Sequence, residues 1–165
     1  MAPFFFQVNC ILSANEYTKE FSEENRGHAC IAYDSNQLAS NSPCEDARTE
    51  GSLLNSTGLL VGVFDGHAGN SCAQVISKRL LRYIGASLLS PSTLRQCIQE
   101  GAKSNSFLKC HNDKHDFVEE LRELYEQSFQ KFSSDLLEKR QENFQFSMSE
   151  VLENAFLRLD EDIST

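Results

Sequence analysis

The chain has 165 residues, enough for one sizeable core and too few for two comfortable domains. Apolar residues make up 40% of it and charged residues 24%, which is ordinary for a soluble globular protein. Its net charge of −9 argues against a nucleic-acid partner, which would require a clustered basic face. No window approaches the run of about 18 apolar residues that a membrane-spanning helix needs.

The first part of the chain predicts a short lead-in segment followed by strands. Residues 7–17 carry a short apolar helical pattern, and residues 18–27 are polar and predict a loop. Residues 28–33 form a plausible short strand, although their alanines weaken it. A second strand is expected to start within residues 44–49, and residues 50–58, which contain several turn-forming residues, would connect it to the next strand.

A run of six uncharged residues, Leu59–Phe64, predicts a buried strand that ends in Asp-Gly-His-Ala-Gly. We expect this strand to pair with the one at residues 44–49. The pairing would bring Glu45 and Asp46 beside Asp65. Three carboxylates placed together repel one another, and a divalent cation relieves that repulsion. From the residues alone, a hydrated acidic loop is the alternative.

The turn after this strand has the chemistry of a metal site. Gly66 allows the backbone to turn sharply and leaves its own carbonyl uncovered by a side chain. That carbonyl and the Asp65 carboxylate offer hard oxygen ligands suited to Mg²⁺ or Mn²⁺. Asp-Gly is also a common turn dipeptide, so an ordinary strand-to-helix turn is the alternative.

The remainder of the chain predicts helices. Apolar spacing after Asn70, a good N-cap, indicates an amphipathic helix with Cys72 in its core face. Lys78, Arg79 and Arg82 share part of the exposed face of that helix and are interpreted as solvated residues rather than a phosphate site.

Two more helices are predicted at residues 92–100 and 117–136, separated by a surface insertion at residues 101–114. His111 and His115 are four residues apart in or beside that insertion. They lack a second ligand pair, so they predict a polar loop and not a zinc site.

The last predicted helix opens with a capping box, Ser147-Met-Ser-Glu150. Its apolar positions recur at helical spacing and predict a core stripe. The stripe consists of Val151, Leu152, Ala155, Phe156 and Leu159.

The residues at 63–69, Val-Phe-Asp-Gly-His-Ala-Gly, resemble the signature of the type-2C, metal-dependent Ser/Thr protein phosphatases. The acidic pair Glu45-Asp46 lies where that family keeps its first acidic motif. Within the family, the pyruvate dehydrogenase phosphatases are similar to this chain over four further segments, and the similarity spreads over nearly its whole length. The segments are Asp34–Leu38, Asn41–Asp46, Arg79–Leu89 and Asn154–Ser164.

The resemblance implies a role for each matching position. Asp65 would bridge two Mg²⁺ or Mn²⁺ ions, and the Gly66 carbonyl would bind one of them. Glu45 and Asp46 would hold metal directly or through ordered water. His67 would be the acid that protonates the leaving seryl oxygen, because an imidazole titrates near neutral pH. A hydrogen-bonded turn histidine is the alternative for His67.

The chain departs from the family pattern in two ways. Many members place an arginine four residues before the acidic pair to grip the substrate phosphate. Asn41 stands there, where it would donate hydrogen bonds to the substrate phosphate without adding charge, and Arg48 is the candidate to replace the missing charge. The family fold is a four-layer α-β-β-α sandwich whose metal site includes two late aspartates in motifs that this sequence lacks. We therefore expect an α+β chain forming part of that sandwich, with the C-terminal half absent: a lead-in at residues 1–26 and the N-terminal half of the domain at residues 27–165.

The implied function is a Mg²⁺- or Mn²⁺-dependent phosphatase that removes phosphate from serines of the pyruvate dehydrogenase complex in the mitochondrial matrix. A regulatory subunit or the complex core would be further partners. No transit peptide is recognisable, so a mitochondrial address would have to lie upstream. We expect this chain alone to be inactive. The alternatives are a non-catalytic binding or regulatory protein, and a helical binding module over residues 115–163.

Overall fold

The structure is a computed structural model and describes residues 2–23, 27–100, 106–111, 119–140 and 147–164. Helices and short strands make up most of these residues. Their order is α1 (Ala2–Ser13), β1 (Tyr17–Glu20), β2 (Ala32–Ser35), β3 (Ala47–Leu53), β4 (Leu59–Phe64), α2 (Ser71–Leu88), α3 (Pro91–Gln99), β5 (Leu108–Cys110), α4 (Glu119–Arg140) and α5 (Met148–Ser164).

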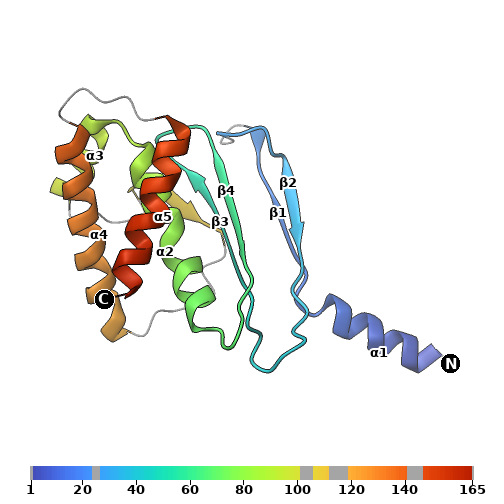
Figure 1. Cartoon of the computed structure of the whole chain (residues 1–165). Helices are drawn as coiled ribbons and strands as arrows, with labels where there is room; N and C mark the ends of the chain where they lie inside the picture. Colours follow the sequence, from blue (N-terminus) through green and yellow to red (C-terminus); the bar gives the residue numbers. More distant parts are fainter. Residues whose placement is uncertain (1, 24–26, 101–105, 112–118, 141–146, 165) are drawn as a thin grey trace.

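The elements form three layers (Figure 1). One antiparallel sheet has the strand order β4-β3-β5, and β1 pairs with β2 in a separate two-stranded sheet. Helix α2 packs on β3 and β4, while α4 and α5 pack on α2. The two-stranded sheet lies on the other side of the larger sheet, and α1 projects away from the body. The predicted α+β class is confirmed, and the four-layer sandwich remains a prediction.

Strand β3 connects the layers because its alternate side chains face opposite ways. Leu53 joins the hydrophobic core on the helical side. Arg48, Glu50 and Ser52 face the two-stranded sheet, where the Arg48 guanidinium lies 5.7 Å from the centre of the Tyr17 ring. The middle strand therefore has an apolar face toward the helices and a polar face toward β1 and β2.

The core is aromatic and lies between α2, α4 and the larger sheet. Tyr83 and Phe129 are almost fully buried. The Tyr83 ring stacks on Phe132 at 4.6 Å between centroids and meets Phe129 edge-on at 5.5 Å. Phe107, just before β5, stacks on Phe129 at 6.1 Å, so the short strand is tied into the same cluster. This packing fixes the helices over the sheet.

The helices predicted after Asn70, at residues 92–100, over the described part of 117–136 and from Ser147 are confirmed, and so is the capping box. The helical pattern at residues 7–17 only overlaps α1, which ends at Ser13. Ser147 donates from its backbone N–H and its hydroxyl to Glu150 Oε2 at 2.7 and 2.8 Å, and the Glu150 N–H donates back to Ser147 Oγ at 3.3 Å. These hydrogen bonds favour the ionised carboxylate and lower the pKa of Glu150. Among the described residues no helix is both long and apolar enough to cross a membrane.

Several predicted boundaries in the N-terminal half are wrong. The loop expected at residues 18–27 contains β1, and the strand expected at residues 28–33 begins only at Ala32 and runs to Ser35. These two polar strands pair with each other, and the Thr18 hydroxyl donates to Asp34 Oδ1 at 2.7 Å. Strand pairing between distant segments overrides the weak local preference of such residues.

The connection expected at residues 50–58 and the insertion expected at residues 101–114 are also partly strands. β3 continues to Leu53 and pairs with β5 through Gly51 and the two residues that follow it. A Cβ at Gly51 would lie 2.9 Å from Leu108 Cδ1, so the glycine interpreted as a breaker permits close packing between strands. The rest of the predicted insertion, apart from residues 106–111, lies outside the described residues.

Burial also differs from the predictions. Strand β4 is not buried on both faces, since Val61 and Val63 are 60% and 79% exposed. Cys72, assigned to the core, is exposed. On α5, Leu152 and Phe156 are exposed, although the other three members of the stripe are buried. The spacing of apolar residues identifies the helix, but how many of these residues are buried depends on the elements that pack against it.

The basic face of α2 is the opposite case. Arg79, assigned to solvent, is 4% exposed. It donates to Tyr83 Oη at 3.1 Å and Ser128 Oγ at 2.9 Å, and it lies 3.9 Å from the Asp162 carboxylate. Arg82 forms a two-bond ion pair with Glu126 at 2.9 and 3.0 Å. The two arginines therefore connect α2 to neighbouring helices. The spacing of the arginines in the sequence does not reveal this role.

Candidate functional site

The acidic residues meet at one edge of the larger sheet, where β3 begins and β4 ends. The register pairs Ala47 with Phe64, so Asp46 and Asp65 each lie one residue beyond the last pair. The Gly66 N–H donates to Asp46 Oδ1 at 3.2 Å. The predicted pairing of these two strands is confirmed, and it places the Glu45–Asp46 segment against the turn that follows β4.

Gly66 is required by a close backbone approach. A Cβ at this position would lie 2.0 Å from the Glu45 carbonyl oxygen, which no side chain tolerates. The turn continues through Ala68 and Gly69, with φ of 60° and 129°, before α2 begins. The absence of a Cβ thus allows the acidic segment and the turn to pack backbone to backbone.

Amide side chains hold the acidic segment from the other side. Gln37 Nε2 donates to the Asp46 carbonyl at 2.8 Å and lies 3.3 Å from Cys44 Sγ. Asn41 Nδ2 donates to Glu45 Oε2 at 3.2 Å. The sequence analysis did not assign a role to Gln37. Its place inside the Asp34–Leu38 segment, which carries part of the family resemblance, was the available signal.

Accessibility differs among the candidate residues. Asp46, Asp65 and His67 are exposed, while Glu45 is half-buried. Exposed carboxylates and an exposed imidazole at one edge are open to a metal ion and to a phosphorylated side chain. The hydrogen bond from Asn41 orients one oxygen of Glu45 and leaves the other for a ligand.

Arg48 lies on the face of β3 that turns toward β1 and β2. Its guanidinium pairs with the Glu50 carboxylate and lies over the Tyr17 ring. The substrate-phosphate role suggested for Arg48 remains a prediction, and these contacts direct its charge away from the acidic edge.

The donor set at the acidic edge suits a hard divalent cation, since carboxylate and carbonyl oxygens are the ligands of Mg²⁺ and Mn²⁺. The missing Cβ of Gly66 lets its backbone lie directly against the Glu45 backbone, which brings the two segments that carry these donors together. Over the described parts of the chain, no three His, Cys, Asp or Glu side chains converge closely enough to hold an ion by themselves. The groups present therefore fit part of a coordination sphere.

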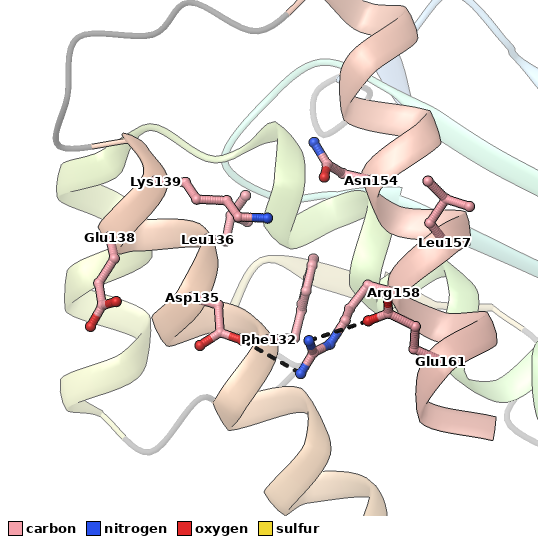
Figure 2. A pocket seen from close by; sticks show the side chains of 9 residues that line it. All are labelled: Phe132, Asp135, Leu136, Glu138, Lys139, Asn154, Leu157, Arg158 and Glu161. Atoms are coloured by element: carbon pink, nitrogen blue, oxygen red, sulfur yellow. Dashed lines mark hydrogen bonds and ion pairs between the residues drawn. The ribbon is translucent and has the colours of Figure 1, made fainter. Parts of the chain in front are cut away.

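A groove between α4 and α5 is separate from this edge (Figure 2). It encloses about 450 Å³, and none of the predicted site residues lines it. Arg158 crosses it and pairs with Asp135 at 3.5 Å and Glu161 at 3.4 Å. The positive charge of Arg158 is therefore paired with carboxylates that line the groove. The lining residues are Phe132, Asp135, Leu136, Glu138, Lys139, Asn154, Leu157, Arg158 and Glu161.

Comparison with known proteins supports the resemblance carried by the motifs. The chain is 40% identical over 96% of its length to human mitochondrial pyruvate dehydrogenase [acetyl-transferring] phosphatase 1, and 36% identical over the same share to human phosphatase 2. The Saccharomyces cerevisiae phosphatase 1 is 32% identical over 62% of the chain. The chain spans 31% of the length of each human relative. No protein-family model matches.

Proposed function

We infer that this chain, a homologue of the pyruvate dehydrogenase phosphatases of the type-2C family, supplies one side of the active site of a metal-dependent phosphoserine phosphatase. One observation carries the proposal: β3 and β4 bring Asp46 and Asp65 to the same edge, where Gly66 binds Asp46. The residues that the motif resemblance implies as metal ligands are thus the ones that the strand register brings to one edge.

The residues that would hold metal are Asp65, the Gly66 carbonyl, Glu45 and Asp46. When bound there, divalent ions would supply an activated water as the nucleophile and neutralise charge on the phosphoryl oxygens. The chain's own contribution is to keep these ligands in place. Asn41 orients the Glu45 carboxylate through its amide, and this contact favours a supporting role for Asn41 over direct binding of the substrate phosphate.

His67 is proposed as the acid that gives a proton to the leaving seryl oxygen. It follows Asp65 by two residues and is exposed at the same edge. An imidazole has an ordinary pKa close to neutral pH, so it can carry a proton before the reaction and release it during P–O cleavage.

The relatives' names state the substrate and compartment proposed for the whole protein: phosphorylated pyruvate dehydrogenase, in the mitochondrion. We extend this to the matrix, with a regulatory subunit or the complex core as further partners. Because the described carboxylates supply only part of a coordination sphere, we also propose that the isolated chain binds metal weakly and does not turn over substrate.

The test is Mn²⁺ binding by electron paramagnetic resonance, beside hydrolysis of a phosphoserine peptide. Asp65→Asn should weaken Mn²⁺ binding by about tenfold or more, since it removes a charged ligand. Asp160→Asn is the matched control, because it makes the same change at an exposed position on α5.

Equal binding by the chain and its Asp65→Asn variant would contradict the metal site. Hydrolysis by the isolated chain that disappears in this variant would confirm the site and contradict the proposed inactivity. Metal binding without hydrolysis is the expected result. It also fits the second candidate, a non-catalytic binding protein. Pull-down with a phosphorylated and an unphosphorylated substrate peptide would distinguish the two candidates, because only a binding protein should retain the phosphorylated peptide as an isolated chain.

A further inference from the structure

A second group of metal-ligating side chains lies between the two sheets, at the end of β3 far from the acidic edge. His28 precedes β2, Ser52 is on β3, and His111 follows β5. Both histidines direct the same ring atom at one oxygen: the Nε2 atoms lie 3.4 Å (His28) and 2.7 Å (His111) from Ser52 Oγ. Three segments distant in sequence thus converge on a single point.

Aromatic packing fixes both imidazoles. The Phe21 ring meets His28 edge-on at 4.5 Å and 88°, and it meets His111 at 5.3 Å and 66°. The backbone of His111 is held as well, because its N–H donates to the Glu50 carbonyl at 2.8 Å and its carbonyl accepts from Tyr17 Oη at 3.2 Å. The two rings therefore converge through tertiary contacts on both sides.

Imidazole nitrogens on a shared point suit a borderline transition metal. Zn²⁺ binds histidine nitrogen at about 2.0–2.1 Å, and Ni²⁺ and Cu²⁺ also favour imidazole. For both Nε2 atoms to reach one ion, the Ser52 hydroxyl, which now lies 3.4 and 2.7 Å from them, would have to rotate about χ1 out of the point between the rings, and the rings would have to move toward each other. Buried Glu50, two residues before Ser52, lies on the same face of β3 but pairs with Arg48. Over the described residues no third His, Cys, Asp or Glu side chain joins the two imidazoles, so these would be the protein ligands.

We propose that His28 and His111, converging on Ser52, form a site for a transition-metal ion of the Zn²⁺ class that ties the β1–β2 sheet to the β4-β3-β5 sheet. Water completes the coordination. The site differs in chemistry from the acidic edge, where all donors are hard oxygens. It does not depend on the phosphatase proposal, and it gives a structural role to a histidine that the sequence assigned to a polar loop.

Binding of such an ion should stabilise the folded chain, because the ligands lie together only when the two sheets are packed. The measurement is calorimetric titration of the metal-free chain with Zn²⁺ and Ni²⁺ in excess Mg²⁺, with the melting temperature recorded in parallel. We expect saturable binding of one ion and an upward shift of the melting temperature. Mg²⁺ should not compete, because it avoids nitrogen ligands.

His28→Gln and His111→Gln should each abolish the shift, whereas Ser52→Ala should keep it. His67→Gln is the matched control, since it removes an exposed histidine at the opposite end of β3. A shift that survives in both His28→Gln and His111→Gln, or that disappears in His67→Gln, would overturn the proposal.

A second variant keeps the test decisive if the glutamine variants unfold. Ser52→Cys places a thiol between the two rings, so Co²⁺ should give an intense sulfur-to-metal absorption band in the near ultraviolet together with visible bands of tetrahedral coordination. A Ser52→Cys protein that is folded by circular dichroism but shows no such bands would contradict the site.

Discussion

The helical side of the molecule and the acidic edge of its larger sheet are built in opposite ways. On the helical side, α2, α4 and α5 enclose aromatic rings and even bury Arg79, whose contacts reach three helices. At the acidic edge, Asp46, Asp65 and His67 are exposed, and few hydrogen bonds hold them. The first region contains most of the buried contacts, and the second carries the residues that we propose bind metal.

This difference indicates how the two regions should respond to mutation. Changes on the helical side should lower the free energy of unfolding and leave the metal affinity of the folded molecules intact. Changes at the acidic edge should weaken metal binding with little effect on unfolding, because the residues there bury little surface. Four substitutions test this separation.

The largest effect is expected from Arg79→Met. It removes the buried guanidinium and leaves the half-buried Asp162 with Tyr83 and Arg158 as remaining partners, so the free energy of unfolding should fall by about 3 kcal/mol. Urea unfolding measures this. Arg95→Met, an exposed change of the same kind on α3, is the control and should change stability little. Equal effects of the two variants would show that the buried arginine is not a stabilising contact.

Gly66→Ala should separate the two regions most clearly. The new Cβ collides with the Glu45 carbonyl, so the acidic segment must move, and Mn²⁺ affinity should fall by about 10- to 100-fold. Gly27→Ala is the control, since a Cβ there would meet its nearest atom at an ordinary 3.6 Å. Unchanged Mn²⁺ affinity in Gly66→Ala would rule out the close approach as a determinant of the site.

Gln37→Met removes the amide that holds the Asp46 carbonyl while keeping the length of the side chain. Loss of one hydrogen bond of this kind costs about 1 kcal/mol, so Mn²⁺ affinity should drop by about fivefold. Electron paramagnetic resonance measures it, with Gln7→Met on α1 as the matched control. A fall in melting temperature without a change in affinity would mean that Gln37 supports the fold and does not position the acidic pair.

The smallest effect is expected from Ser147→Ala, which removes half of the capping box and should lower the melting temperature by about 2–4 °C. Because the folded-state pKa of Glu150 lies below its ordinary 4.5, its contribution is complete at neutral pH and is lost as the pH falls through the folded-state pKa. The difference between the chain and its variant should therefore shrink below about pH 4.5, as melting curves recorded from pH 7 downward can show. A difference that is constant with pH would contradict the role of Glu150.

Local chemistry in the sequence was sufficient to predict the strand Leu59–Phe64, the helix that follows it and the position of the acidic edge. An uninterrupted apolar run, a sharp Asp-Gly turn and helical spacing are short-range signals, so they survive without knowledge of the fold. The pairing of β3 with β4 could be predicted because two strands joined by a short connection usually pair with each other as an antiparallel hairpin. The capping box was equally local, since all its partners lie within four residues.

Only the tertiary structure decided which side chains are covered. Burial of Arg79 is possible because partners from three helices surround it. Asp162 offsets its charge, and the hydroxyls of Tyr83 and Ser128 accept its hydrogen bonds. Strands β1 and β5 form because distant segments pair with them, and the meeting of His28 with His111 depends on that packing. Hydrogen bonding and burial between remote segments depend on three-dimensional proximity, which composition and periodicity along one chain do not record.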